Sequence, residues 1–183
     1  MGYDRMSRIL HWLTALIVLA MIPVGLVMTN VDNRAIQDPL FIFHKNAGAL
    51  LIVLLALRLV WRATHRAPPL PDSLPTIQKF AARATHVALY LLLIVMAVSG
   101  YVRVRAGGFP VELLDAVGVP NFVPRDDNLA QTAKAIHARA KFGIGLFIAL
   151  HVAAAAYHGL IRRDGVFSRM WPPTAPASAA RVP

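Results

Sequence analysis

The chain of 183 residues is 57% hydrophobic and only 15% charged, with a mean hydropathy of +0.55. A soluble domain of this length cannot bury so much apolar surface, so the composition indicates a membrane protein, and the net charge of +10 does not indicate a nucleic-acid partner. The absence of cysteine excludes disulfides, thiolate-bound iron–sulfur clusters and covalently attached haem.

Two long apolar segments open the chain. Residues 9–31 carry no charge over 23 positions, which is enough to cross a bilayer as a helix. This run is too long for a secretory signal and no A-x-A cleavage site follows it, so a retained helix is expected. Residues 41–61 form the second expected span. Lys45 and Arg58 lie near its ends, from which their side chains are expected to extend to the membrane surface.

Two further spans follow a Pro-rich linker, APPLPDSLP, at residues 67–75. The third span, residues 84–102, is uncharged over 19 positions, and the fourth, residues 138–161, has charges only near its start. The connection 103–134 is rich in Gly, Pro and Asp, and VELLDAV within it predicts a short amphipathic helix. The composition of the tail 170–183 predicts disorder.

The four spans predict an all-α membrane protein, an antiparallel four-helix transmembrane bundle that forms one domain over residues 1–183. The two tails and the connection 58–83, which are expected on one side, carry 11 Lys and Arg residues and only 3 acidic residues. The opposite connection, 103–134, carries 4 of each sign. The positive-inside rule therefore predicts that both termini are cytoplasmic.

The segment 135–159, which includes most of the fourth span, contains three histidines, although it is otherwise built mainly from Ala, Gly, Leu and Ile. At about 100° per residue, His137, His151 and His158 fall on one stripe of the helix, and the first two are separated by roughly 21 Å along its axis. Polar side chains are costly in lipid, so this stripe indicates a functional role.

The predicted topology gives each membrane histidine a depth. His44 and His137 fall at the outer ends of two different spans and form an opposed pair. At the inner level His151 has three possible partners, and depth alone leaves the choice open: His11, His86 or His158. Two imidazoles that face each other across a bundle suit a haem iron, because neutral imidazole binds iron without adding a buried charge. A zinc site is disfavoured, because no span contains Cys, Asp or Glu.

Several motifs of the chain resemble the bacterial cytochrome b561 family, in the same order and over nearly the whole length. They are HW at 11–12, FHKNAG at 43–48, RLVWR at 58–62, IH at 136–137, LHVAAAAYHG at 150–159, and the terminal Arg169, Met170 and Pro172. The resemblance implies a cytochrome of the bacterial inner membrane that holds two haem b groups without covalent bonds. The implied axial ligands of the haem irons are two pairs: His11 with His151, and His44 with His137.

The family includes superoxide oxidases. The resemblance therefore implies an oxidoreductase that takes electrons from superoxide at the outer face and passes them through both haems to ubiquinone. Ubiquinone reduction consumes protons, so a quinone site needs a proton donor. His158, with Trp12 as a flat apolar wall, is the candidate at the inner end, and His86 is the alternative. Outer cations would attract the superoxide anion. The cations expected near the outer surface are Lys45, Arg103, Arg105, Lys134, Arg139 and Lys141.

Two other functions stay open at this stage. More distant relatives are b-type subunits of hydrogenases and formate dehydrogenases, so the first alternative is a subunit that carries electrons from such a complex to the quinone pool. The short ends of the chain and the lack of an evident docking domain count against it. The second alternative is a haem-free structural or transport protein, which an absorption spectrum would distinguish at once.

Overall fold

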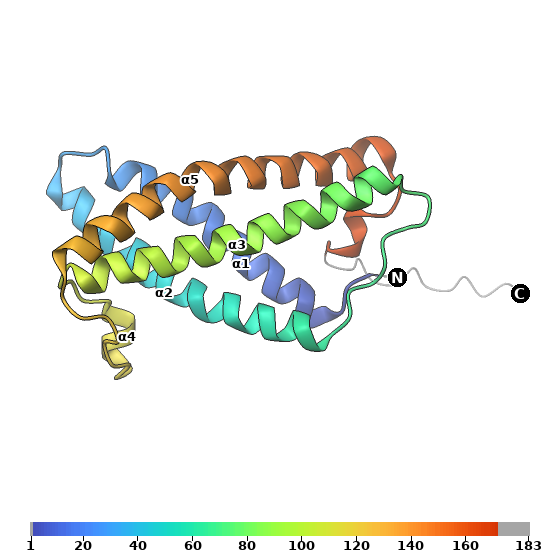
Figure 1. Ribbon diagram of the computed structural model, residues 1–183. Coiled ribbons are helices and arrows are strands. Elements are labelled where there is room, and N and C mark those ends of the chain that lie inside the picture. The colour runs from blue at the N-terminus through green and yellow to red at the C-terminus, as the bar shows by residue number, and fades with distance from the viewer. Residues whose placement is uncertain (1, 172–183) are drawn as a thin grey trace, which may run out of the picture.

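A computed structural model describes residues 2–171 of the chain (Figure 1). Four long helices run side by side and alternate in direction. They are α1 (Arg5–Met28), α2 (Arg34–Thr64), α3 (Thr76–Ala106) and α5 (Asp127–Ala156). Each is long and apolar enough to cross a membrane, and no strand occurs within the described range. The prediction of an antiparallel four-helix transmembrane bundle is confirmed.

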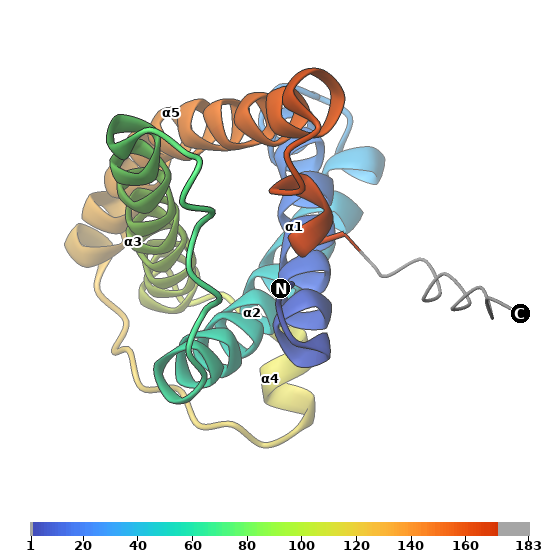
Figure 2. The same ribbon diagram turned by 90° about the vertical axis from the view of Figure 1, so that its right-hand side faces the viewer.

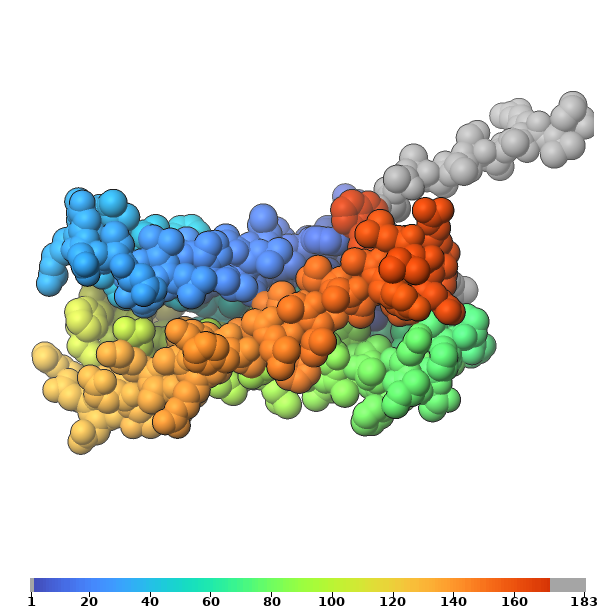
Figure 3. Space-filling model, turned by 90° about the horizontal axis from the view of Figure 1, so that it is seen from above, coloured from blue at the N-terminus to red at the C-terminus, as the bar shows by residue number. Residues whose placement is uncertain are grey.

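The four helices form two closely packed pairs. α1 packs along α2, α3 packs along α5, and contacts between α2 and α3 join the pairs. Seen end-on, the four helices surround a common axis (Figure 2). α5 runs obliquely across the bundle, from the α3 side at one end towards α1 at the other (Figure 3). Side chains of α1 and α5 therefore face each other across the bundle, although the two backbones make little close contact.

The helices extend beyond most ends of the predicted spans, because polar residues continue them outside the hydrocarbon layer. Side chains cap three of the four helix starts: Asp4 accepts from the backbone N–H of Ser7, Asn33 from Ala35, and Asp126 from Leu129. α1 ends three residues before its predicted end at residue 31. Its last carbonyls accept hydrogen bonds from the side chains that follow, such as Asn30 Nδ2 to Leu26 O at 2.7 Å.

The outward faces of the bundle are apolar. Leu16 on α1, Phe142 on α5 and Leu160 just beyond α5 leave 67%, 72% and 73% of their surface exposed. Exposure of large apolar side chains on all sides of a bundle is unfavourable in water and suits a lipid environment.

The predicted amphipathic segment forms the short helix α4 (Glu112–Ala116), as expected from the sequence. Two ion pairs attach α4 to the long helices: Lys45 on α2 contacts Glu112 at 2.5 Å, and Arg105 on α3 contacts Asp115 at 2.6 Å. The side-chain oxygen Oδ1 of Asn46 also accepts a hydrogen bond from the backbone N–H of Leu113 at 2.9 Å. The long connection between α3 and α5 is therefore fixed at this end of the bundle (Figure 1).

Three segments meet at the opposite end of the bundle. α5 continues into η1 (Tyr157–Arg162), a π-helix, and a tight turn leads to η2 (Phe167–Arg169). Arg169 O accepts from Tyr3 N at 3.0 Å, and the Arg169 side chain donates to Pro69 O at 2.7 Å. Residues 170 and 171 of the tail follow η2 in this turn. The rest of the tail, for which disorder is predicted and which includes the last residue of the terminal motif, lies outside the described residues.

Candidate functional site

The histidine pair expected at the outer level is brought together by α2 and α5. The ring centres of His44 and His137 lie 6.3 Å apart, and the planes are inclined at 79°. Nδ1 of His137 lies 2.9 Å from the Met96 carbonyl oxygen. A carbonyl only accepts, so Nδ1 carries the hydrogen and Nε2 keeps a free lone pair that can bind a metal.

Two glycines on the neighbouring helices leave room for these rings. A Cβ atom on Gly25 of α1 would lie 3.1 Å from Cε1 of His44, and one on Gly100 of α3 would lie 3.2 Å from Cε1 of His137. Any larger residue at either position would press on an imidazole. The sequence contains no signal for this role, because small residues are common wherever membrane helices pack.

At the inner level the ring of His151 has two imidazole neighbours. His11 on α1 lies 6.2 Å away, centre to centre, and His86 on α3 lies 5.3 Å away. Both His11 and His86 therefore lie close enough to His151 to be its partner, as their similar depths in the membrane predict. His65 stacks on Trp61 at the end of α2, with ring centres 3.7 Å apart, and takes part in neither level.

Arg58 of α2 points into the bundle. Its Nη2 lies 2.9 Å from Nδ1 of His11, and its Nε donates to the hydroxyl oxygen of Tyr90 at 2.9 Å. The expectation that Arg58 extends to the membrane surface is wrong. An arginine has no acceptor, so Nδ1 of His11 accepts in this arrangement. A lone arginine within an apolar span is itself a signal of function, and that signal identifies Arg58 from the sequence.

The two residues expected at a quinone site both lie against the turn that contains η2. Nε1 of Trp12 donates to Met170 O at 2.9 Å, and its ring meets the Trp171 ring edge-on at 5.5 Å. Nδ1 of His158 lies 2.6 Å from Oδ2 of Asp164. Burial alone would raise the pKa of the Asp164 carboxyl group, but its hydrogen bonds, first of all the one from His158, hold the pKa below its ordinary value.

The outer cations divide into paired and unpaired groups. Lys45 and Arg105 are bound to acidic residues of α4, and only 5% of Arg105 is exposed, so the expectation that these two attract an anion is wrong. The hydrogen bond from Arg105 holds the pKa of the Asp115 carboxyl group low, so this pair stays charged at neutral pH. Arg103 has no acidic partner in the described part of the chain.

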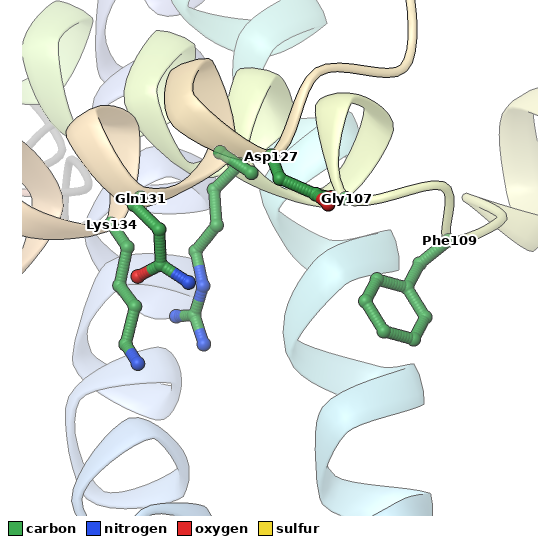
Figure 4. Close-up of a pocket in the computed structure, with 7 residues that line it drawn as sticks. Gly107, Phe109, Asp127, Gln131 and Lys134 are labelled. Atoms are coloured by element: carbon green, nitrogen blue, oxygen red, sulfur yellow. The ribbon is translucent and has the colours of Figure 1, made fainter.

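With Lys134 of α5, Arg103 lines a cavity of about 350 Å³ at the C-terminal end of α3. Figure 4 shows Gln131 and Lys134 extending into this cavity from the same helix. The cavity therefore has two cations in its lining.

A membrane four-helix bundle with pairs of imidazoles facing each other in its core is typical of membrane cytochromes. In residues 2–171 no three His, Asp or Glu side chains are grouped closely enough to hold one metal ion. The profile of the family described as prokaryotic cytochrome b561 matches residues 2–173. The chain belongs to the prokaryotic cytochrome b561 family, a family of haem b proteins that transfer electrons in bacterial membranes.

Curated relatives agree with this assignment. Cytochrome b561 homolog 2 of Escherichia coli (strain K12) is 34% identical over 172 residues, covering 92% of this chain and 90% of that protein. Cytochrome b561 homolog 1 of the same organism is 28% identical over 173 residues, covering 93% and 97%. A protein named probable superoxide oxidase CybB, from Yersinia pestis, is 26% identical over 171 residues, covering 93% and 96%. No solved structure matches the chain significantly.

Proposed function

We propose that the protein is a dihaem b cytochrome that takes electrons from superoxide at the outer face and delivers them to ubiquinone at the inner face. The observation that carries the proposal is the two facing pairs of imidazoles, one at each level of the bundle, with nearly equal spacing. Similarity to a probable superoxide oxidase supports the choice of donor.

The spacing of the rings fits a haem iron between them. Allowing about 2 Å for each metal–imidazole bond and adding the radius of each ring, two imidazoles on opposite sides of one iron have centres roughly 6 Å apart. The spacings of 6.2 Å for His11 with His151 and 6.3 Å for His44 with His137 agree with this value. The 5.3 Å between His86 and His151 is shorter, which favours His11 as the inner ligand.

Haem b, when bound at these two sites, supplies one-electron transfer. The chain provides the ligands, an apolar surrounding and the position of each site. His11 would hold the haem iron through Nε2 only with its ring hydrogen on Nδ1, so Arg58 would then have to release that nitrogen. His137 already has its hydrogen on Nδ1, so its bond to the Met96 carbonyl is compatible with ligation as it stands.

The reaction joins one-electron chemistry at one end to two-electron chemistry at the other. Two superoxide anions give up one electron each and leave as O₂. Ubiquinone takes the two electrons and two protons and leaves as ubiquinol. Arg103 and Lys134 attract the anion at the outer cavity. At the inner end His158 donates protons to the quinone, and Trp12 forms an apolar wall of its site.

The orientation is part of the proposal: both termini lie in the cytoplasm, and the connection that carries α4 faces outward. Reporter fusions at residue 120 and at the C-terminus should give opposite signals, external for the first and cytoplasmic for the second. A C-terminus found outside would reverse the assignment of donor and acceptor faces.

Ubiquinol formation by the purified chain tests the function. In proteoliposomes that contain ubiquinone, pulses of superoxide should produce ubiquinol and O₂, and added superoxide dismutase should abolish the reaction. If ubiquinol forms only after a partner dehydrogenase and its substrate are added, the chain is an electron-transfer subunit and the proposed donor is wrong.

A further inference from the structure

The turn after α5 brings an acidic side chain back to His158. Arg163 has φ of 50° and Gly165 has φ of 79°, so the chain reverses sharply on either side of Asp164. Oδ2 of Asp164 lies 2.6 Å from Nδ1 of His158, and the two side chains are only 13% and 14% exposed. His158 itself lies on a π-helix, a form that is frequent at functional sites.

Asp164 fixes the hydrogen positions of the His158 imidazole. An ionised carboxylate only accepts hydrogen bonds, so Nδ1 of His158 carries a hydrogen and Nε2 is left to serve another partner. The half-buried carboxylate keeps the Nδ1 hydrogen in place, so a protonated imidazole can give away only its Nε2 hydrogen. The pair therefore has the arrangement of a proton donor held in position by a second group.

A cavity adjoins the other side of the carboxylate. Its volume is about 640 Å³, and Asp164 lines it together with Arg8 of α1, Pro69 of the linker and Arg169 of η2. Arg162 of η1 adds a cation whose Nε is 4.0 Å from Oδ2 of Asp164. The segments that line the cavity are the N-terminal end of the chain, the linker and the last turn. These segments meet at one end of the bundle (Figure 2).

We propose that Asp164 is a positioning residue for quinone reduction: it orients His158 and holds its Nδ1 hydrogen, and the adjoining cavity admits the water that returns the proton. This inference rests on the proposed quinone site beside His158. In each transfer the Nε2–H bond of His158 breaks and an O–H bond forms on the reduced quinone. A proton from cytoplasmic water then restores the ring. Two such transfers accompany the two electrons that make one ubiquinol.

The test replaces Asp164 by Asn in the haem-loaded, full-length protein in proteoliposomes with ubiquinone. The amide keeps the shape but removes the charge, so ubiquinol formation should slow by roughly a hundredfold, the usual contribution of a general acid. Haem content and the rate of haem reduction by superoxide should stay unchanged.

Two further variants keep the test specific. Asp164→Glu should recover much of the rate, because it restores the charge. Asp72→Asn makes the same change in the linker, where Asp72 is exposed and lies 3.9 Å from Lys79, and should behave like the parent. A parent-like rate of ubiquinol formation in Asp164→Asn would overturn the inference, as would an equal slowing of haem reduction. If the parent itself forms no ubiquinol, the proposed function fails instead.

Discussion

Replacement of His137 by Ala is expected to halve the haem content, from two haem b groups per chain to one. The substitution removes one of the two imidazoles that face each other at the outer level, 6.3 Å apart, and leaves the inner level untouched. His44→Ala should have the same effect, because a haem held by one axial ligand in an otherwise apolar bundle binds weakly. Quantification of haem per chain, together with the spectrum of the remaining haem, gives the result.

His86→Ala is the matched control, since it removes an imidazole of the same bundle that lies against His151. This variant should retain both haems. Loss of the inner haem in His86→Ala would make His86 the ligand in place of His11. Full haem content with an unchanged low-spin spectrum in His44→Ala or His137→Ala would contradict the outer pairing.

The second large effect concerns the encounter with superoxide. The bimolecular rate of haem reduction should fall roughly tenfold between 0.1 M and 1 M salt, because the Debye length shrinks from about 10 Å to about 3 Å. Arg103→Gln combined with Lys134→Gln should cause a similar fall at low salt, because both cations line the cavity at the C-terminal end of α3. Pulsed generation of superoxide, with absorbance detection of the reduced haem, measures the rate.

Control variants distinguish the effect of where the positive charges lie from the effect of the total positive charge. Arg66→Gln with Lys79→Gln removes two positive charges from the opposite end of the bundle, and this variant should react as fast as the parent. Arg105→Gln combined with Asp115→Asn should also have little effect on the rate, because this change removes a pair of charges that already neutralise each other. A rate that is independent of salt, with the outer double variant as fast as the parent, would refute steering and favour a docked electron donor.

The sequence predicts the bundle well because each span is read directly from a run of apolar residues. It also predicts that His44 meets His137, since both lie at the outer ends of their spans. It does not decide between His11 and His86, because both lie near the same depth as His151. Only the packing of three helices sets the ring spacings of 6.2 Å and 5.3 Å.

Whether a charged residue is free or paired depends on ion-pair partners that hydropathy does not reveal. Lys45 and Arg105 are read from the sequence as free cations, but the position of α4 brings Glu112 and Asp115 to them. Asp164 is six residues from His158 and meets it only because the backbone after η1 reverses. Contacts of this kind follow from loop geometry, which composition and periodicity do not encode.

Haem stoichiometry of the purified full-length chain tests the central claim most directly. The account predicts two haem b groups per chain, both extractable without breaking a covalent bond and both with the low-spin spectrum of an iron held by two imidazoles. A folded chain that holds one haem or none would contradict it, because the two facing histidine pairs would then not both be haem sites.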